Sequence, residues 1–486
     1  MVFVNPRSTK FGIFDKYVPL SVPIGVGSLA GYLRKQGEPV LVLDEHVVCI
    51  TPELLKGLKF PPGQTPVFGI STLTACAKRS YEIARLIKQT LPGALVILGG
   101  IHPTVLPEEV LGNKDVDFLF RGEAEEILLE FLRRLSSGRD VRSIPGLSYR
   151  KNGEIAHNPA AALPDLSAMP AFPYDMFENS QDRYSFGFIA SSRGCPYDCI
   201  FCSQRVISGQ KYRYKPSPVV LEEIEQLVLK YGQSHINFVD DNFTANKKRV
   251  VELCEGILQR GFHRRVTFDC QTRADAVDDE ILSLLKKSGF RLINFGFETA
   301  SERLMKILNK RETVQENRDA VALAKKHGFG VSGTFIFGLP TETRRERWQA
   351  YEMATEMDLD YVRFNNATPY PGTRLYEIAR EEGRLFVAPD WSNLNACGSL
   401  VHDRSIESRL PYVPEGSDEK TLRKDVVRAN LYFSLRPKRV LRLLLKRVGP
   451  AGWFYLPPRW YCRPQEWWGL LKLGTSLFTT FLRSMF

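Results

Sequence analysis

Long hydrophobic runs are missing from this chain of 486 residues. No stretch reaches the roughly 20 uninterrupted apolar residues that a membrane-spanning helix needs. The first ten residues are polar and mixed, without the apolar core of a signal peptide. A composition of 43% hydrophobic and 25% charged residues is typical of a folded protein with a large core. We therefore expect a cytoplasmic protein of two or three domains.

A disulfide framework is also missing. The chain has nine cysteines, an odd number, and three of them lie within eight residues, at Cys195, Cys199 and Cys202. A disulfide framework spreads its cysteines in pairs, whereas a metal site clusters them. The pattern favours a metal site in a reducing compartment.

Internal repeats and low-complexity segments are absent, and the positive charge is uneven. The net charge is +11, but residues 436–486 hold ten Lys or Arg against one acid, which gives +9 for this tail alone. The rest of the chain is nearly neutral, so the charge does not indicate nucleic-acid binding by the main body.

The first part of the chain alternates strand-like and helix-like runs. Short, nearly continuous apolar segments lie at residues 39–43, 66–70, 94–98 and 116–120. Such runs, separated by helices, predict a parallel sheet covered on both faces. We expect a doubly wound, Rossmann-like α/β domain over residues 1–150, with ligands beyond the carboxyl ends of its strands.

A second alternating series follows a proline-rich linker at residues 151–184. Strands are expected near residues 187–190, 235–239, 266–270, 292–297, 330–337 and 361–365, and helices near 218–231, 246–260, 278–288, 313–327 and 343–357. Six such βα units predict a partial (β/α)6 barrel over residues 185–400, with its chemistry at the strand carboxyl ends. Residues 401–486 are expected to form a helical C-terminal region.

The three clustered cysteines have the spacing CxxxCxxC directly after the first barrel strand. Three thiolates on a [4Fe-4S] cluster leave one iron open. That iron can chelate the amino and carboxylate groups of S-adenosylmethionine (SAM) and deliver an electron to its sulfonium, which yields a 5′-deoxyadenosyl radical. A zinc site or unused thiols are the alternatives, but zinc wants a fourth ligand, and neither His235 nor Cys254 is suitably spaced. We interpret the three cysteines as cluster ligands.

Several further motifs make residues 10–375 resemble the radical SAM superfamily, in the branch with an N-terminal cobalamin-binding-like domain. They lie at residues 236–242, 268–275, 294–299, 332–343 and 369–373. The resemblance implies that SAM is bound by Phe201, Asp240, Asp241, Arg273, Gly296, Glu298, Ser332 and Gly338.

The expected roles of the charged members follow from their chemistry. Glu298 and Asp241 could accept hydrogen bonds from the SAM ammonium and ribose hydroxyls. Arg273 could pair with the SAM carboxylate through its fork of donors. The alternative is that Asp240, Arg273 and Glu298 simply form ion pairs at the rim of the barrel.

The N-terminal domain resembles cobalamin-binding domains at residues 18–33, 98–103 and 116–125. The resemblance implies a corrinoid between the two domains, bound by Ser71, Thr72, Thr74, Gly99, Gly100, His102 and Glu123. His46 follows Asp44 as in an axial-histidine motif, but Cys49 stands where that motif needs glycine. We therefore interpret His46 as an ordinary loop residue, and His102 as a residue near the pocket, not an axial ligand.

Residues 436–486 combine basic, leucine-rich and tryptophan-rich patterns at helical spacing. Leu441, Leu444, Leu445 and Val448 fall on one helical face, with Arg439, Arg442 and Lys446 opposite. Such helices favour peripheral contact with a membrane surface. The alternative is that they dock on the barrel with their charges solvated.

The resemblance as a whole implies a cobalamin-dependent radical SAM methyltransferase. Its target would be an unactivated carbon of a hydrophobic or lipid-like small molecule, with flavodoxin or ferredoxin as electron donor and no nucleic acid. The alternatives are an oxidative cyclase or another radical rearrangement enzyme, and a non-catalytic cobalamin- or SAM-binding protein. An RNA methylthiotransferase would need a second cysteine trio, and the N-terminal domain has only Cys49 and Cys76.

Overall fold

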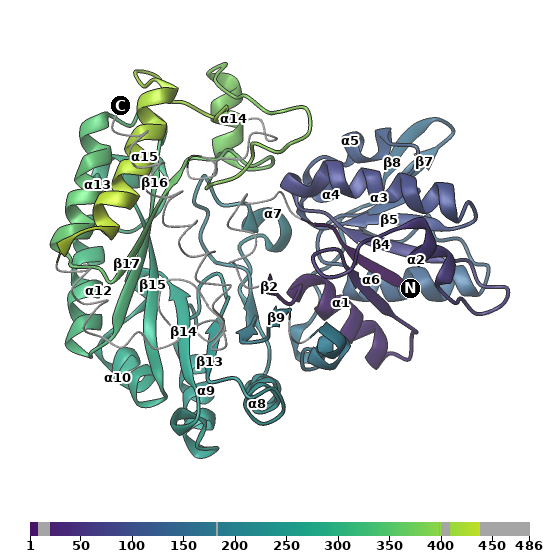
Figure 1. The fold of residues 1–486 in the computed structure, drawn as a ribbon, viewed down its shortest axis with the longest axis horizontal. Helices are drawn as coiled ribbons and strands as arrows, with labels where there is room; N and C mark the ends of the chain where they lie inside the picture. The colour runs from purple at the N-terminus through teal and green to yellow at the C-terminus, as the bar shows by residue number, and fades with distance from the viewer. Residues whose placement is uncertain (8–19, 181–182, 398, 400–408, 438–486) are drawn as a thin grey trace, which may run out of the picture.

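Two α/β bodies lie side by side in the computed structural model, which describes residues 1–7, 20–180, 183–397, 399 and 409–437. In Figure 1 the N-terminal domain is on the right and the second domain on the left. No helix in the described ranges is long and apolar enough to cross a membrane. The predicted amphipathic tail at residues 438–486 lies outside the described residues.

The N-terminal domain is built on a seven-stranded sheet of order β3-β1-β4-β5-β6-β7-β8. The first five strands in this order are parallel, and β7 and β8 are antiparallel additions at one edge. The elements are β1 (Val2–Asn5), α1 (Ile24–Lys35), β3 (Leu41–Asp44), α2 (Pro52–Gly57), β4 (Val67–Ser71), α3 (Ala77–Thr90), β5 (Leu95–Gly99), α4 (Ile101–Val105), α5 (Pro107–Gly112), β6 (Phe118–Phe120), α6 (Glu125–Ser136), β7 (Leu147–Lys151) and β8 (Glu154–His157).

Both faces of this sheet are buried, as predicted. One core contains Val4, Phe68 and Leu98, and a second core, on the other face, contains Phe3, Val67 and Ile97. Neighbours along each strand therefore pack against opposite helix layers, which is why these strands read as continuous apolar runs. The strand order reverses between β1 and β4, and this is the place where doubly wound domains bind ligands.

The β7–β8 hairpin was not predicted and carries the sheet to His157, past the expected boundary at residue 150. Its turn is Asn152–Gly153, and both residues have positive φ angles, of 53° and 88°. An Asn-Gly pair between two short strands is the preferred sequence of a tight hairpin. The signal was present in the sequence, although the α/β rhythm around it masked it.

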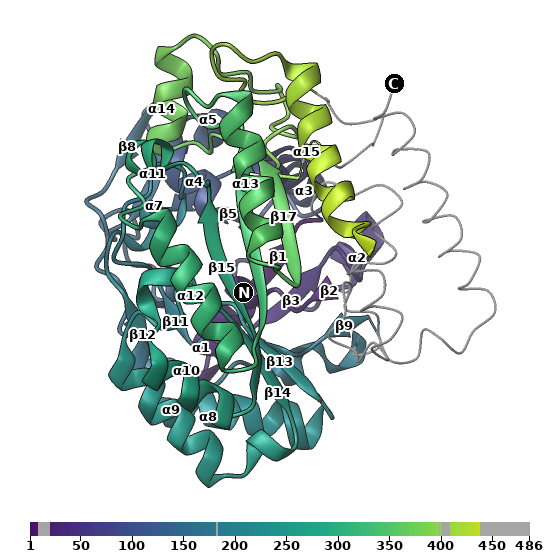
Figure 2. The same ribbon diagram turned by 90° about the vertical axis from the view of Figure 1, so that its left-hand side faces the viewer.

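The second domain is an open, all-parallel sheet of six strands in the order β10-β13-β14-β15-β16-β17, as the βα rhythm predicted. Figure 2 shows helices α12, α13 and α15 in front of this sheet. The elements are β10 (Phe188–Ile189), β11 (Ser192–Arg193), α7 (Gln204–Ser208), β12 (Arg213–Tyr214), α8 (Ser217–Glu225), β13 (His235–Phe238), α9 (Lys247–Gln259), β14 (Thr267–Thr272), α10 (Asp279–Lys287), β15 (Phe290–Glu298), α11 (Glu302–Ile307), α12 (Val314–Lys326), β16 (Gly330–Phe337), α13 (Arg344–Glu356), β17 (Tyr361–Asn366), α14 (Arg374–Glu381) and α15 (Glu419–Ser434).

Side chains alternate between the two faces of this open sheet. Phe295, Phe335 and Phe364 belong to the large core under the helices. The residues next to each of them along its strand point to the opposite face of the sheet, which we call the inner face. The strand register places Gln271, Asn294, Ser332 and Tyr361 in one row across the inner face, and Gly296, Thr334 and Arg363 in the next row.

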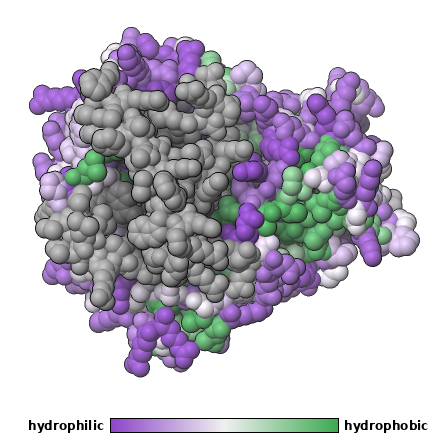
Figure 3. Space-filling model, viewed as in Figure 1, coloured by the Kyte–Doolittle hydropathy of each residue, from purple (hydrophilic) through white to green (hydrophobic). Residues whose placement is uncertain are grey.

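Short strands and a connector join the two domains. β2 (Leu20–Ser21) pairs in parallel with β9 (Tyr184–Ser185). The Tyr184 hydroxyl donates to Oδ2 of Asp44, at the carboxyl end of β3, at 2.8 Å. On the face seen in Figure 3, the coloured residues are largely hydrophilic, with a hydrophobic group of residues over the N-terminal domain.

Candidate functional site

The cysteine loop begins directly after β11, where backbone geometry demands glycine. Gly194 has a φ of 85°, and a Cβ there would overlap the carbonyl oxygen of Lys211. Its N–H donates to Oδ2 of Asp241 at 3.0 Å. Asp241 follows β13, so the second barrel strand fixes the start of the cysteine loop.

The rest of this loop is held by two other segments. The N–H of Ile200 donates to the Leu308 carbonyl at 3.0 Å, and the N–H of Leu375 donates to the Ile200 carbonyl at 2.9 Å. Phe201 packs partly buried against Leu304 and its neighbours. These contacts fix the backbone that carries the three thiols.

The three thiols suit a multinuclear cluster. Cys199 is buried, and Cys195 and Cys202 are half-buried. Burial raises the pKa of all three, to about 11 for Cys202. Within the described ranges, no group of three His, Cys, Asp or Glu side chains is placed to hold a single metal ion. A four-iron cluster binds each thiolate to a different iron, so these donors fit a [4Fe-4S] cluster.

A buried lysine that the sequence analysis missed lies beside the predicted SAM site. Lys310 is 5% exposed, and its Nζ lies 3.4 Å from Oε1 of Glu298 and 3.6 Å from Oε2 of Glu312. Burial lowers the pKa of Lys310, but Glu298 and Glu312 outweigh it and raise the pKa overall. The site therefore has a fixed positive charge next to Glu298. Nothing in the local sequence pattern distinguishes this lysine from its neighbours.

Gly296 makes this arrangement possible. A Cβ at Gly296 would lie 2.5 Å from Oε1 of Glu298 and 3.3 Å from Nζ of Lys310. Glu298 itself has a φ of 64°, an unusual conformation for a residue with a side chain. The end of β15 thus turns back so that the carboxylate of Glu298 lies over the glycine.

The Arg273 guanidinium is already engaged within the protein. Its Nε and Nη2 donate to the Asp275 carboxylate at 2.9 and 2.8 Å, and Nη2 also donates to the Lys310 carbonyl at 2.8 Å. The guanidinium carbon lies 3.5 Å from the ring centre of Tyr197, in the cysteine loop. This geometry matches the ion-pair alternative and makes Arg273 a support of that loop.

The two neighbouring aspartates after β13 differ in their surroundings. Asp240 is buried and accepts hydrogen bonds from the Ser191 hydroxyl at 2.9 Å and from Ser192. Asp241 accepts a hydrogen bond from the Gly194 N–H, and burial raises its pKa to about 6. Asp240 therefore holds β11 in place, whereas Asp241 keeps acceptor capacity for a ligand.

Asn242, next in the chain, has an unsatisfied donor. Its Oδ1 accepts from the Thr272 hydroxyl at 2.9 Å, but its buried Nδ2 has no hydrogen-bond partner in the described structure. A buried amide without a partner is costly unless a ligand or water completes it. Together with Asp241 and Glu298, it offers the acceptors and donor that the polar groups of SAM need.

Ser332 lies within β16, and Gly338 directly follows its last residue. Ser332 lies in the row with Asn294 on the inner face. Gly338 has a φ of 84°, and a Cβ there would lie 2.8 Å from Leu422 of α15. Its N–H donates to Oε2 of Glu342 at 2.5 Å. A glycine is therefore required at position 338 because the chain turns there after β16 and packs closely against α15.

The predicted cobalamin-binding residues lie beside the switch point of the N-terminal sheet. Thr72 donates its hydroxyl to Ser80 at 3.0 Å, and its N–H donates to the Gly99 carbonyl at 2.7 Å. Gly100 has a φ of 102°, and a Cβ there would lie 2.9 Å from the Thr72 carbonyl oxygen. At Gly99 a Cβ would meet nothing within 4 Å. The carboxyl ends of β4 and β5 thus pack closely against each other at Gly100 and leave space for a ligand at Gly99. We call this surface the floor of the site.

This floor suits a flat, amide-rich ligand such as a corrinoid. Ser71 is half-buried and Thr74 is 5% exposed, and they lie at and just after the carboxyl end of β4. Leu73, between Thr72 and Thr74, is 59% exposed. Hydroxyl groups with an exposed apolar side chain among them fit a ring with a hydrophobic face and polar side chains.

His46 and His102, the two histidines considered as cobalt ligands, are tied to other residues. His102 is fully buried, and its Nε2 lies 3.0 Å from the Tyr81 hydroxyl and 2.9 Å from Oε2 of Glu109. Trp391, from a loop after the barrel, packs edge-on against its ring at 5.3 Å. The ring of His46 is bonded to Asp44 at 2.9 Å. His102 thus joins the two domains.

Glu123 lies in the joint between the two domains. Arg193 donates to its Oε2 at 2.7 Å, and Arg213 and the Ser208 hydroxyl also bind its carboxylate. Arg193 also binds Oε1 of Glu125 at 2.6 Å. Burial raises the pKa of Glu123, but Arg213 and Arg193 outweigh it and hold that pKa below its usual value. The carboxylate is saturated by protein partners, so the structure places it in a clamp between the domains.

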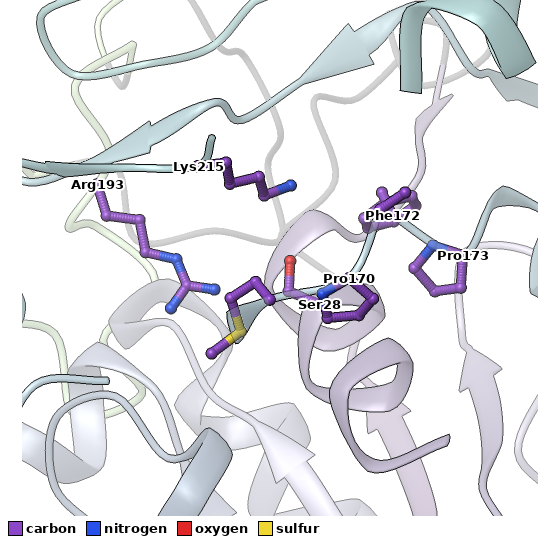
Figure 4. Close-up of a pocket in the computed structure, with 8 residues that line it drawn as sticks. Ser28, Pro170, Phe172, Pro173, Arg193 and Lys215 are labelled. Carbon is purple, nitrogen blue, oxygen red and sulfur yellow. The ribbon is translucent and has the colours of Figure 1, made fainter. Parts of the chain in front are cut away.

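A small pocket lies beside this clamp (Figure 4). Arg193 and Lys215 of the barrel domain line it on one side, and Ser28 of α1 and the connector residues 169–173 line the rest. Lys215 is paired with Glu223 at 2.6 Å, and Arg193 with its two glutamates. Both cations are therefore neutralised, and the pocket belongs to the joint.

Comparisons with known proteins agree with this geometry. Residues 189–354 match the model of the radical SAM superfamily, and residues 12–132 match that of the B12 binding domain. An uncharacterized methyltransferase of Pyrococcus horikoshii is 32% identical over 88% of this chain and 91% of its own length. The anaerobic magnesium-protoporphyrin IX monomethyl ester cyclase of Cereibacter sphaeroides is 28% identical over 84% of this chain and 67% of its own length.

A solved structure shows the same fold. The radical SAM methyltransferase TsrM from Kitasatospora setae, with cobalamin and a [4Fe-4S] cluster bound, superposes with a TM-score of 0.71, at 18% identity over 90% of this chain and 89% of its own. The chain belongs to the radical SAM superfamily, in the branch with an N-terminal B12-binding domain, and is an enzyme whose cofactors are a [4Fe-4S] cluster, SAM and cobalamin.

Proposed function

We propose that this enzyme transfers a methyl group to an unactivated carbon of a small molecule. The observation that carries the proposal is the clamp of Glu123 and Glu125 on Arg193. Arg193 lies two residues before Cys195, so a residue of the cobalamin-binding domain is tied to the strand that leads into the cysteine loop. Two cofactors that must act on one substrate need such a fixed relation.

Each domain contributes its own part. Cobalamin would supply a methyl group, and the cluster with SAM would supply a radical that removes a hydrogen atom. The thiols of Cys195, Cys199 and Cys202 would ligate the cluster. Residues Asp241, Asn242 and Glu298, the last held by Lys310, would orient SAM through its ammonium, carboxylate and hydroxyl groups. Ser71, Thr74 and Gly99 would hold the corrinoid.

We further propose a substrate with a large hydrophobic part, such as a lipid. Val239, directly after β13, is 41% exposed at the carboxyl end of the barrel, where an apolar substrate could pack. The basic, tryptophan-rich composition of residues 436–486 suits peripheral contact with a membrane, where such substrates reside. The electron would come from a flavodoxin or ferredoxin.

Oxidative ring closure is the second candidate, because a cyclase aligns with 84% of the chain. The two reactions differ in product mass. Methylation adds the methyl group of SAM, whereas oxidative ring closure removes hydrogen and adds none.

The proposal is tested on protein made anaerobically with cobalamin and incubated with methyl-deuterated SAM, a reductant and a small-molecule cell extract. We expect near-stoichiometric cobalt, release of 5′-deoxyadenosine and a deuterated methyl group in one product. A Cys195/Cys199/Cys202→Ala variant should keep cobalt and lose both other signals, whereas Cys49→Ala, at an exposed cysteine, should keep all three. 5′-Deoxyadenosine with an unlabelled, dehydrogenated product would instead indicate ring closure.

A further inference from the structure

The inner face of the barrel sheet is polar where it approaches the SAM site. Its first row holds Gln271, Asn294, Ser332 and Tyr361, whose side chains carry amide and hydroxyl groups. Gln271 is exposed, and the other three are partly exposed. A sheet face that only closed on an apolar core would not carry this row. The row is therefore suited to recognise hydrogen-bonding groups of a ligand.

One atom in this row has no protein partner. The Nδ2 of Asn294 donates to Oε1 of Gln271 at 3.4 Å, but its Oδ1 is buried and accepts no hydrogen bond from the described residues. An unsatisfied buried acceptor is costly, so a bound donor group would stabilise it. Asn294 lies two residues before Gly296, on the strand that ends at Glu298.

The second row places one arginine at the level of the SAM site. The register aligns Gly296, Thr334 and Arg363 on three neighbouring strands. Strands lie about 4.8 Å apart, so the Arg363 backbone is about 10 Å from Gly296 across the same face. Phe364, the next residue, packs into the core under the helices, so the Arg363 side chain projects from the inner face.

The charge of Arg363 is not neutralised by the part of the chain that the structure describes. The side chain is exposed, and no carboxylate among those residues pairs with it. The buried ammonium of Lys310, by contrast, lies between the carboxylates of Glu298 and Glu312. Arg363 thus places a positive charge on the inner face, at a distance from Glu298 that one small molecule could span.

We propose that Arg363 binds an anionic group, a carboxylate or a phosphate, on the substrate. The row of Gln271, Asn294 and Ser332 binds the polar groups next to it. This inference rests on the proposed function, because it assigns the substrate to the same inner face that SAM reaches. It makes the substrate amphipathic: the anion is bound at Arg363, and the carbon that loses hydrogen lies nearer to Gly296.

The first test measures anion binding without any turnover. Phenylglyoxal modifies unpaired guanidinium groups, and peptide mass spectrometry gives the modification rate of each arginine in the full-length protein. Inorganic phosphate and acetate are the probes. We expect one or both to slow modification of Arg363 severalfold and saturably, with no effect on Arg345, which is exposed on α13. The stronger probe distinguishes phosphate from carboxylate. Equal rates with and without both anions would overturn the proposal.

The second test uses turnover with methyl-deuterated SAM. The small-molecule extract is first divided by anion exchange into a retained, anionic fraction and a neutral fraction. We expect the labelled product from the anionic fraction only, and an Arg363→Gln variant should make it about tenfold more slowly or worse, because a charge-assisted hydrogen bond is lost. Arg363→Lys should restore part of the rate, and Arg345→Gln should match the unmodified enzyme.

The outcomes separate this proposal from the proposed function. A labelled product from the neutral fraction, or one made equally well by Arg363→Gln, would refute anion recognition and leave methyl transfer standing. If 5′-deoxyadenosine forms but neither fraction gives a labelled product, methyl transfer fails, and the modification rates alone decide whether Arg363 is an anion site.

Discussion

Lys310 lies with its ammonium 3.4 Å from the carboxylate of Glu298, and both side chains are almost fully buried. The lysine comes from the segment after α11, and the glutamate from the end of β15. A buried charge that loses its partner typically destabilises a protein by about 3–5 kcal/mol. This pair therefore links the stability of the fold to the position of the Glu298 carboxylate, which we propose binds SAM.

Lys310→Met should lower both the melting temperature and the affinity for SAM. The variant leaves Glu298 and Glu312 buried without their shared cation, so the Glu298 carboxylate should lose the charge that holds it in place. Scanning calorimetry and equilibrium dialysis with SAM measure the two effects. Lys306→Met, at an exposed position on α11, is the matched control. Unchanged SAM affinity in Lys310→Met would show that Glu298 does not depend on the lysine.

Gly296→Ala should impair SAM binding more than stability. The added Cβ would meet the Glu298 carboxylate at 2.5 Å and would have to displace it. We expect SAM affinity to fall about tenfold or more, equivalent to about 1.4 kcal/mol. Gly93→Ala, where a Cβ meets nothing within 4 Å, should have no effect on either quantity. Unchanged SAM affinity in Gly296→Ala would show that Glu298 is not part of the SAM-binding site.

Glu342 should make stability fall as the pH rises from about 4.5 to about 7. Burial raises the pKa of Glu342 from 4.5 to about 7, against the opposing effects of Arg347 and the Gly338 N–H. Between these values the folded state binds more protons than the unfolded state, so its contribution is full at low pH and lost at high pH. The slope from this group is at most about 1.4 kcal/mol per pH unit.

Glu342→Gln tests this pH effect directly. Arg347 keeps a second partner, Asp425 at 2.9 Å, so its charge stays paired in the variant. Melting temperatures measured from pH 4.5 to 8 should fall less steeply for Glu342→Gln than for the unmodified protein. Parallel profiles would mean that Glu342 stays ionised throughout this range.

Glu123→Gln should loosen the joint between the domains. Arg193 would keep only Glu125 as a charged partner, and Arg213 would keep the Pro164 carbonyl at 3.0 Å. We expect lower cobalt retention after gel filtration and faster proteolysis of the connector, with a loss of about 3 kcal/mol or more of stability. Glu126→Gln, at an exposed position on α6 three residues further along the chain, is the control. If Glu123→Gln retains as much cobalt as the unmodified protein and its connector resists proteolysis equally well, Glu123 does not hold the two domains together.

The fold was largely predictable because it depends on short, regular patterns. All six barrel strands lie where the apolar runs of the sequence place them, for example Gly330–Phe337, and so do the helices between them. Such strands alternate core and inner-face residues, or are buried on both faces, and both patterns are local in sequence. The Asn152–Gly153 hairpin was missed because it departs from the βα rhythm, although its turn signal is equally local.

The site was predictable only in part, because its contacts join distant segments. The motifs identified Asp241, Gly296 and Glu298, but not that Lys310 neutralises Glu298 from 12 residues away. Arg273 and Glu123 carry the right charges for ligand binding, yet Asp275 and Arg193 already bind them. Sequence shows which charges exist, whereas pairing depends on where loops from different strands meet.

The antiparallel pairing of β11 with β12 has a consequence for how the two domains can be recombined. Arg193 and Arg213 are direct neighbours in this pairing, and the N-terminal domain supplies the acids that neutralise them. A barrel fragment beginning near residue 185 would expose two adjacent cations beside the start of the cysteine loop. Exchange of the N-terminal domain between relatives should therefore succeed only when the donor brings acidic residues at the positions of Glu123 and Glu125, so the two domains have to be chosen as a matched pair.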